Sequence, residues 1–318
     1  MKNSQGKISF IFPGQGAQYI GMGQSLHDDF PAARFVFEEA NDTLGYDLKK
    51  ICFEGSIDLL SKTEITQPAI LTTSIAILRV VESLGLQADF CAGLSLGEYS
   101  ALVYSGAFKF SDALSLVRYR GKVMQEAVPE GTGGMMALIG IDRSKAEDLC
   151  QAYRQYGTLQ CSNFNCPGQI VIGGDIKPLT LAQESHKRFG VKKAIRLPVS
   201  APFHTPLLNP AADKLEKALE RIPLGSLNVP IVTNVDASIN RDLSEIKQKL
   251  KMQVCSVVLW EDSVAKLIEE GTETFIEIGP GKSLSGFLKK IDPLKNRYNI
   301  EDLSSLSHCM EIMEGKYD

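Results

Sequence analysis

Short apolar segments in the first third of the chain end at turns that contain glycine or proline. Lys7–Phe12 (KISFIF) ends at Pro13-Gly14, and Asp89–Gly93 (DFCAG) leads directly into Ser95. A strand that feeds a tight turn and then a helix is the basic unit of an α/β sheet, so this pattern predicts the α/β fold class. The expected helices cover residues 31–43, 68–84 and 96–105.

A second series of elements begins near Gly131, where a glycine-rich segment becomes strand-like. Asp142 is placed to cap the helix that follows, and Cys166-Pro167-Gly168 indicates a turn between two strands. The order βαββαβ over about seventy residues matches the ferredoxin-like motif. The expected elements cover residues 131–141, 142–156, 158–165, 169–173, 178–190 and 193–199.

The pattern after Val199 returns to alternating helices and strands. We therefore predict a small domain, residues 130–198, inserted into a large domain formed by residues 1–129 and 199–318. Residues from about Ser304 are expected to form a frayed end. The expected elements of this last part are helices at 209–221 and 242–253 and strands at 229–234 and 274–278.

Composition narrows the functional classes. The chain is 44% hydrophobic and 23% charged, with a formal net charge of −4, which is ordinary for a soluble globular protein and does not favour a nucleic-acid binder. Its seven cysteines form no CxxC pair, so we expect neither a metal site nor a disulfide framework. The N-terminus lacks the apolar run of a signal peptide, and no apolar stretch reaches about 18 residues. We expect a cytoplasmic protein without a membrane partner.

Residues Gly93–Gly97 (GLSLG) match the pattern G-x-S-x-G. In a nucleophile elbow the serine lies on a strained turn between a strand and a helix, and small neighbours allow the turn to close. The expected strand before Ser95 and the expected helix after it supply this context. The alternative is a tight turn with a structural serine.

A serine nucleophile needs a neighbouring base at neutral pH. The chain has four histidines, and His27, His186 and His308 lie in polar or terminal segments that favour solvated side chains. His204 lies in an apolar, proline-bracketed loop between an expected strand and an expected helix, and such loops often carry functional residues. A histidine packed at a helix start is the alternative interpretation, and the elbow at Ser95 favours the catalytic one.

Two further features are ambiguous by themselves. Gly14-Gln15-Gly16 is either a flexible turn or a loop whose backbone N–H groups face the nucleophile; it lacks the lysine of a phosphate-binding loop. Arg118 and Arg120 lie on an expected helix at residues 111–127 and point to different faces. At most one of them should enter a pocket, and a solvated arginine is the default interpretation of either.

Seven segments together resemble the malonyl-CoA:acyl-carrier-protein transacylases of fatty-acid synthesis, a family that includes the acyltransferase domains of polyketide synthases. The resemblance covers nearly the whole chain in the right order and implies an α/β-hydrolase-like large domain with an inserted ferredoxin-like small domain. The segments are FIFPGQGAQYIGMG (10–23), AGLSLGEYSALV (92–103), RGKVMQEAVPEGTGGM (120–135), NFNCPGQIVIGG (163–174), LPVSAPFHTPLLNPAADKL (197–215), VPIVTNVDA (229–237) and FIEIGPGKSLSGFLKK (275–290).

The resemblance also implies a role for each site residue. Ser95 matches the acylated serine, His204 the base, and Arg120 the arginine that holds the malonyl carboxylate. The remaining assignments are the oxyanion-hole amides at Gln15 and Leu96, the histidine-orienting residue at Gln253, and a phenylalanine that favours malonyl over methylmalonyl at Phe203. The sequence departs from the family pattern at Leu94, where the family often has a histidine that is not the base.

The function implied is transfer of a malonyl group from malonyl-CoA to the phosphopantetheine thiol of acyl carrier protein, by a monomer that needs no bound cofactor. Three alternatives stay open. A stand-alone acyltransferase that serves a polyketide synthase would use the same residues. An acyl hydrolase on the same fold is disfavoured because a neutral acyl group gains nothing from Arg120. A non-catalytic binding module is disfavoured because Ser95, His204, Arg120 and Gln253 are all intact.

Overall fold

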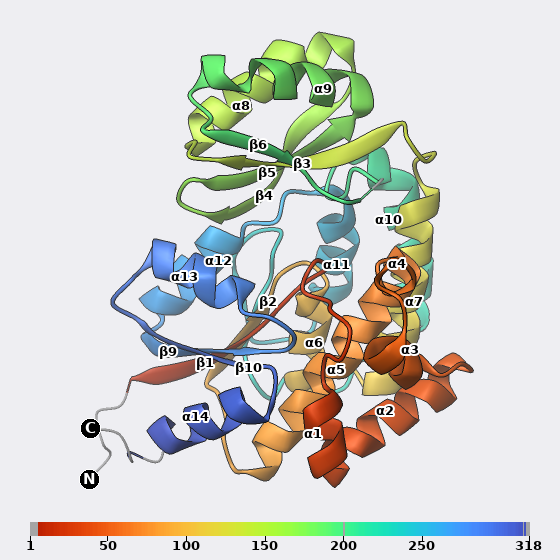
Figure 1. Cartoon of the computed structure of the whole chain (residues 1–318), viewed down its shortest axis with the longest axis vertical. Helices are drawn as coiled ribbons and strands as arrows, with labels where there is room; N and C mark the ends of the chain where they lie inside the picture. Colours follow the sequence, from red (N-terminus) through yellow and green to blue (C-terminus); the bar gives the residue numbers. More distant parts are fainter. Residues whose placement is uncertain (1–5, 200, 314, 316–318) are drawn as a thin grey trace.

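The computed structural model describes residues 6–199, 201–313 and 315, and this part of the chain forms a mixed α/β structure with two sheets (Figure 1). The larger sheet has six strands in the order β10-β9-β1-β2-β7-β8. All neighbouring strands in it are parallel except β7 and β8. Its strands are β1 (Lys7–Phe12), β2 (Phe90–Gly93), β7 (Ile231–Val232), β8 (Ile239–Asn240), β9 (Thr272–Ile278) and β10 (Asn296–Ile300).

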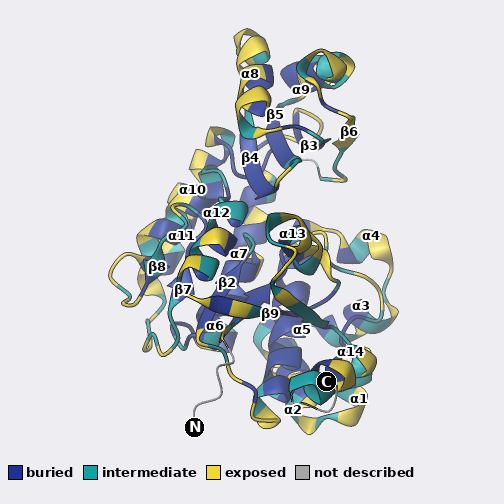
Figure 2. Ribbon diagram, turned by 90° about the vertical axis from the view of Figure 1, so that its left-hand side faces the viewer, coloured by how far each residue is buried: buried dark blue, intermediate teal, exposed yellow. Residues whose placement is uncertain are grey.

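Successive residues of β1 enter different apolar clusters because side chains alternate across a strand. Phe10 and Phe12 belong to the main core, whereas Ile11 packs in a second cluster with α12 and α13. Helices therefore cover both faces of the large sheet, and its central strand β2 lies buried between them (Figure 2). The helices of this part are α1 (Gln24–Asp29), α2 (Pro31–Leu44), α3 (Leu48–Glu54), α4 (Ile57–Leu60), α5 (Thr63–Ser83), α6 (Gly97–Tyr104), α7 (Phe110–Glu126), α10 (Asn209–Arg221), α11 (Ile246–Cys255), α12 (Trp260–Glu269), α13 (Ser283–Ile291) and α14 (Leu303–Met313).

The smaller sheet is antiparallel, with the strand order β4-β5-β3-β6, and α8 and α9 pack on the face turned away from the large sheet (Figure 1). It has its own apolar cluster. As the sequence predicts, the Asp142 side chain caps α8 by accepting a hydrogen bond from the Lys145 N–H. The elements are β3 (Gly133–Ile139), α8 (Arg143–Tyr153), β4 (Leu159–Cys166), β5 (Gln169–Asp175), α9 (Ile176–Ser185) and β6 (Lys193–Arg196), with 3-10 turns at Arg154–Tyr156 and His186–Phe189.

Most expected elements are present with shifted ends, and the expected helix at 209–221 has the expected bounds. The expected frayed end is wrong for the described residues, because Leu303–Met313 form α14, which buries Leu306 and Cys309 against the main core. Residues 314 and 316–318 of that expectation lie outside the described part. The expected strand at 229–234 is only two residues long, and the expected helix at 242–253 begins at Ile246.

Helix α5 corrects a second expectation. It begins at Thr63, before the expected residue 68, and Pro68 lies inside it. By length and composition α5 is apolar enough to cross a membrane, contrary to the expectation that no segment is. However, 83% of its apolar window is buried inside the protein, and it packs between α2, α6 and α7 as a core helix.

The glycine at the end of β2 leads to the first prediction. A Cβ at Gly93 would overlap the carbonyl group of Gly97, so Gly93→Ala should lower the free energy of unfolding by about 1–3 kcal/mol, as overpacking does. Gly286→Ala in α13 is the matched control, because a Cβ there meets no atom within 4 Å. It should stabilise the protein by up to about 1 kcal/mol. Urea denaturation measures both, and a Gly93→Ala protein as stable as the parent would contradict the close packing of the turn.

Candidate active site

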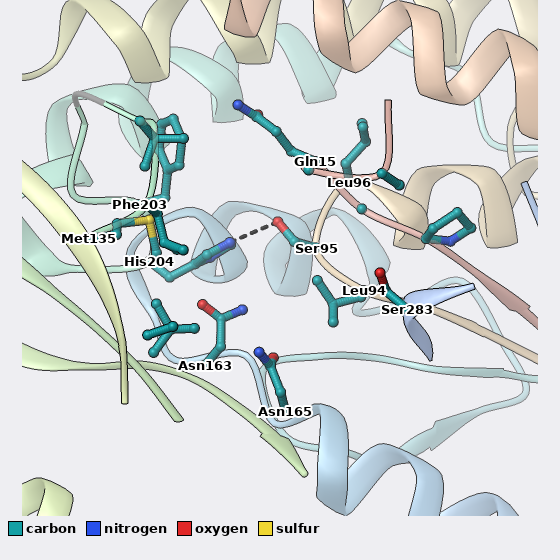
Figure 3. Close-up of a pocket in the computed structure, with 18 of the residues that line it drawn as sticks. Gln15, Leu94, Ser95, Leu96, Met135, Asn163, Asn165, Phe203, His204 and Ser283 are labelled. Atoms are coloured by element: carbon teal, nitrogen blue, oxygen red, sulfur yellow. Dashed lines mark hydrogen bonds between the residues drawn. The ribbon is translucent and has the colours of Figure 1, made fainter. Parts of the chain in front are cut away.

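The carboxyl ends of three neighbouring strands meet at one edge of the large sheet, and a polar residue follows each of them. Gln15 follows β1, Ser95 follows β2, and Asn234 follows β7. Ligands bind preferentially at this edge of an open α/β sheet. A cavity of about 330 Å³ lies here, and residues of the small sheet, including Met135 and Asn163, form its opposite wall (Figure 3).

Ser95 lies on the turn between β2 and α6 in a left-handed backbone conformation, with a φ of 53°. Residues with a side chain adopt this region rarely, at a cost on the order of 1–3 kcal/mol. The turn can be this tight because Gly97 has no side chain. A Cβ at this position would overlap the carbonyl oxygen of Phe12. The structure therefore contains the strained turn that the G-x-S-x-G pattern predicts, and Ser95 Oγ points into the cavity (Figure 3).

His204 contacts the serine directly. Its Nε2 lies 2.7 Å from Ser95 Oγ, and its Nδ1 lies 2.7 Å from the backbone carbonyl oxygen of Gln253 on α11. A carbonyl can only accept, so Nδ1 carries the proton and Nε2 is free to accept the serine proton. Burial and the neighbouring Arg120 guanidinium lower the pKa of His204 from 6.5 to about 3, so the imidazole is neutral at physiological pH.

Gln253 therefore contacts His204 through its main chain, and its side chain has other contacts. Gln253 Nε2 donates to the Ser95 carbonyl oxygen at 3.0 Å, and Gln253 Oε1 accepts from Arg120 at 3.0 Å. One residue therefore contacts the serine, the histidine and the arginine. The sequence predicts its position and cannot distinguish which of its atoms orients the ring.

Arg120 is the one of the two α7 arginines that enters the cavity. It is 1% exposed, and its guanidinium donates to Gln67 Oε1 at 2.9 Å and to Ser95 Oγ at 3.2 Å. Arg118 is exposed on another face of α7, where it donates to the Leu44 carbonyl oxygen. The helix-face argument is therefore confirmed. Among the described residues no carboxylate forms an ion pair with Arg120, although the buried Glu98 lies close enough to interact with its charge.

The two expected oxyanion amides also lie at the cavity. Gln15 and Leu96 both line it, and the backbone N–H of neither forms a hydrogen bond with another described residue. The Ser95 N–H, in contrast, is occupied: it donates to Asn234 Oδ1 at 2.6 Å. Two backbone donors are thus free to bind a negative oxygen beside Ser95.

Phe203 and Leu94 form part of the apolar wall. Phe203, which is 7% exposed, precedes the base, and Leu94 precedes the nucleophile (Figure 3). Leu94 thus contributes apolar surface to the cavity where the family pattern often has a polar ring.

Sequence reasoning missed several polar residues of this region. Asn163 and Asn165 of β4 point toward the cavity from the small sheet (Figure 3). Gln67 of α5 contacts Arg120, and Glu98 and Asn234 lie buried beneath Ser95. Asn163, Asn165, Glu98 and Asn234 fall inside the segments that carry the resemblance, which was the available signal; Gln67 falls outside them. Among the described residues, no group of three or more His, Cys, Asp or Glu side chains is placed to hold a metal ion.

Comparison with known proteins agrees with this geometry. The model of the acyl transferase domain matches residues 9–307, and the chain therefore belongs to the acyl transferase family. It is 45% identical to a malonyl CoA-acyl carrier protein transacylase of Bacillus subtilis, over 98% of this chain and 99% of that protein.

Solved structures give the same result. A malonyl CoA-acyl carrier protein transacylase from Clostridium perfringens superposes with a TM-score of 0.94 at 45% identity, covering 98% of both chains. A malonyl-transacylase in complex with a holo type II PKS acyl-carrier protein superposes with a TM-score of 0.94 at 41% identity, covering 96% of this chain and 99% of that one.

The lowered pKa of His204 gives a prediction about pH. The unfolded chain binds a proton on this residue near pH 6.5, and the folded chain excludes it until about pH 3. The contribution of His204 to the free energy of unfolding is therefore complete above pH 6.5 and declines as the pH falls from 6.5 toward 3. Ring ¹⁵N signals of His204, assigned with a His204→Gln variant, should stay those of a neutral imidazole from pH 8 to 5. A midpoint near 6.5 would contradict the described environment.

Proposed function

We propose that this protein transfers a malonyl group from malonyl-CoA to the phosphopantetheine thiol of acyl carrier protein through a malonyl ester on Ser95. The observation that carries the proposal is the convergence of two groups, an imidazole and a guanidinium, on one serine oxygen atom. Ser95 Oγ lies 2.7 Å from His204 Nε2 and 3.2 Å from an Nη atom of Arg120. A nucleophile, its base and a buried cation thus share one cavity. The proposal also rests on membership in the acyl transferase family.

In the first half-reaction His204 Nε2 accepts the Ser95 proton while Oγ attacks the thioester carbonyl carbon of malonyl-CoA. The negative charge that develops on the carbonyl oxygen is stabilised by the backbone N–H groups of Gln15 and Leu96. The C–S bond then breaks, and His204 returns the proton to the leaving thiolate of CoA. The Gln253 carbonyl stabilises the transient imidazolium through Nδ1.

The second half-reaction reverses the roles of the thiols. The phosphopantetheine thiol of the carrier protein gives its proton to His204 and attacks the malonyl ester carbon. The C–O bond breaks, and Ser95 Oγ recovers the proton from His204. The two half-reactions form a ping-pong sequence in which no other co-reactant is consumed.

Arg120 supplies the selectivity in this proposal. A guanidinium forms two parallel hydrogen bonds with a carboxylate, and such pairs are strong where water is excluded. The malonyl carboxylate neutralises the buried charge, whereas an acetyl group leaves it unpaired. Phe203 supports a second preference, because its ring occupies space near the base that the branching methyl of methylmalonyl needs.

The related malonyl-transacylase in complex with a type II PKS acyl-carrier protein supports a second candidate. In that case the chain supplies malonyl units to a polyketide carrier protein by the same chemistry. The acyl hydrolase is disfavoured, because Arg120 has no use for a neutral acyl group. We further propose a cytoplasmic monomer that binds no cofactor, no nucleic acid and no membrane.

We also propose the domain division that the sequence predicts, with a ferredoxin-like small domain at residues 130–198 and an α/β-hydrolase-like large domain at 1–129 and 199–318. The strand order β4-β5-β3-β6 and the antiparallel pairing support the first part. The nucleophile elbow at Ser95 supports the second.

Ser95 is the predicted site of acylation. Incubation with malonyl-CoA should add one malonyl mass to the intact protein, and the mass should map to the peptide that contains Ser95. His204→Ala should acylate about 10²–10⁴-fold more slowly, which is the usual contribution of a general base. Malonyl labelling of a Ser95→Ala protein would refute the assignment.

Arg120 is predicted to discriminate between acyl groups without taking part in the bond changes. Arg120→Ala should lower kcat/KM for malonyl-CoA by the factor that corresponds to a loss of about 2–4 kcal/mol, the contribution of a buried charge-assisted pair. The same variant should preserve or raise the rate of acetyl transfer. Arg120→Lys should recover part of the malonyl activity, because an ammonium cannot form the bidentate pair.

The matched control for this prediction is Arg118→Ala on the other face of α7, which should be nearly silent. A malonyl-to-acetyl ratio that stays at the parent value in Arg120→Ala, or collapses in Arg118→Ala, would show that Arg120 is not the carboxylate site.

A further inference from the structure

Two buried polar residues beneath the nucleophile have no part in the mechanism above. Asn234, which follows β7, has no exposed surface, and Glu98, in the first turn of α6, is 1% exposed. Burying a carboxyl group or an amide is costly unless hydrogen bonds compensate. The Asn234 side chain bonds the turn that carries Ser95, and Glu98 Oε2 bonds Asn234 and Gln253, whereas Glu98 Oε1 has no hydrogen-bond partner among the described residues.

The Asn234 side chain forms hydrogen bonds with two backbone groups of the strained turn. Its Oδ1 accepts the Ser95 N–H at 2.6 Å, and its Nδ2 donates to the Gly93 carbonyl oxygen at 2.7 Å. These bonds flank Leu94 and end at the N–H of Ser95, the residue whose φ is 53°. The side chain therefore satisfies backbone groups that a left-handed turn would otherwise leave unpaired. An amide suits this position because it presents an acceptor oxygen and a donor nitrogen side by side.

Glu98 connects this clamp to the residue that orients the base. Its Oε2 accepts the Asn234 backbone N–H at 3.0 Å and Gln253 Nε2 at 2.8 Å. Because a carboxylate acceptor faces Nε2, the Gln253 amide must turn Oε1 toward Arg120. The Gln253 backbone in turn holds His204. One carboxylate oxygen is thus bonded to the neighbours of both the nucleophile and the base.

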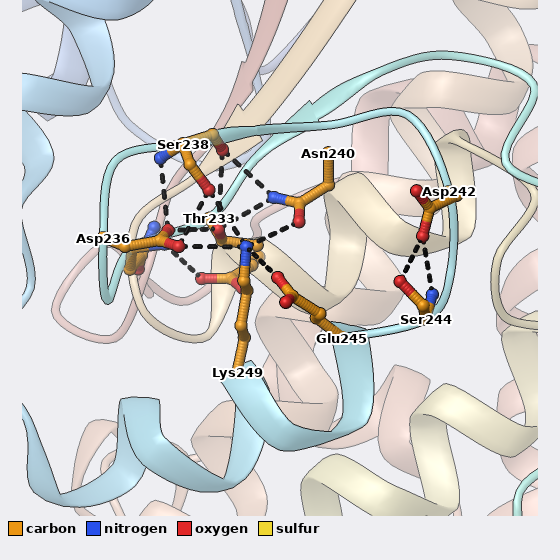
Figure 4. Close-up of polar contacts among 10 residues, drawn as sticks. Thr233, Asp236, Ser238, Asn240, Asp242, Ser244, Glu245 and Lys249 are labelled. Atoms are coloured by element: carbon orange, nitrogen blue, oxygen red, sulfur yellow. Dashed lines mark hydrogen bonds and ion pairs between the residues drawn. The ribbon is translucent and has the colours of Figure 1, made fainter.

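A separate cluster holds the segment that carries Asn234 against α11 (Figure 4). Lys249 lies one helical turn before Gln253, and its Nζ is 2.9 Å from Asp236 Oδ2 and donates to Asn240 Oδ1 at 2.7 Å. Thr233 Oγ1 donates to Asp236 Oδ1 at 2.7 Å. Asn234 and Gln253 therefore belong to segments that are fixed relative to each other, and Glu98 bridges them at the end nearest the site.

We propose that Glu98 and Asn234 act as a pair of positioning residues that align Ser95 Oγ with His204 Nε2. The proposal rests on the proposed function, since it concerns the acylation of Ser95. Neither residue touches the substrate. Their removal therefore lowers the rate constant of acylation and leaves the affinity for malonyl-CoA unchanged.

The test is single-turnover acylation by malonyl-CoA, quenched and read by intact-protein mass. Glu98→Ala and Asn234→Ala should each lower the rate constant at saturation by about 10–100-fold, because small misplacements of reacting groups have effects of this size. The malonyl-CoA concentration for half-maximal rate should change less than about twofold. The double variant should resemble the slower single variant, because both residues act on the same turn.

Two isosteric variants keep the test decisive if an alanine variant fails to fold. Glu98→Gln keeps an acceptor oxygen at the Oε2 position and should retain a rate within about threefold of the parent. Asn234→Asp accepts the Ser95 N–H and cannot donate to the Gly93 carbonyl, so it should stay slow. Parent-like acylation by Asn234→Asp would overturn the proposal, as would rates within twofold of the parent in both alanine variants.

Ser9→Ala is the matched control for lost buried hydrogen bonding. Ser9 lies in the same sheet, and its Oγ is 2.8 Å from Thr272 Oγ1. This variant should lower the Tm and acylate at the parent rate. A parent protein that is not acylated at Ser95 at all would refute the proposed function. An acylated parent with unaffected variants would refute only the positioning pair.

Discussion

A buried cation without a directly paired carboxylate is the constraint on which the rest of the site depends. Arg120 is 1% exposed, and its hydrogen-bond partners are neutral: Gln67, Gln253 and Ser95. Burying an unpaired charge costs several kcal/mol, so the cavity favours any ligand that brings a carboxylate. The same charge, together with burial, keeps His204 neutral and able to accept a proton. In the proposed function, Arg120 thus determines acyl selectivity and, second to burial, also contributes to the neutral state of His204.

The parallel sheet brings the residues of the site together at one edge. Strands β1, β2 and β7 are neighbours, so the residues after their carboxyl ends meet at one place although they lie far apart in the sequence. The turn at Ser95 is strained. Glycines in the turn permit its close packing, and the Asn234 side chain bonds the Gly93 carbonyl oxygen and the Ser95 N–H. Local strain at the nucleophile is therefore sustained by contacts that only the complete fold provides.

The sequence predicted what depends on local pattern. Strand-turn-helix spacing indicated Ser95, and an apolar loop together with the elbow at Ser95 indicated His204. Helical periodicity placed Arg118 and Arg120 on different faces, and only the resemblance selected Arg120. The sequence did not predict β10, which carries few apolar positions, or α14, most of whose residues are half-exposed. Nor did it predict roles for Glu98 and Asn234, because the burial that gives a polar residue its role is a tertiary property. The resemblance assigned Gln253, and only the coordinates revealed that its carbonyl oxygen contacts the base.

The central claim is that one serine ester passes its acyl group to a thiol. The most direct measurement isolates the malonyl-enzyme, removes free malonyl-CoA and mixes the enzyme with a carrier protein that bears phosphopantetheine. We expect one malonyl group on the carrier thiol for each malonyl group lost from Ser95, at a rate no slower than kcat. A carrier protein without the phosphopantetheine arm should receive none. Release of free malonate in place of malonyl-carrier protein would contradict the account and identify the chain as a hydrolase.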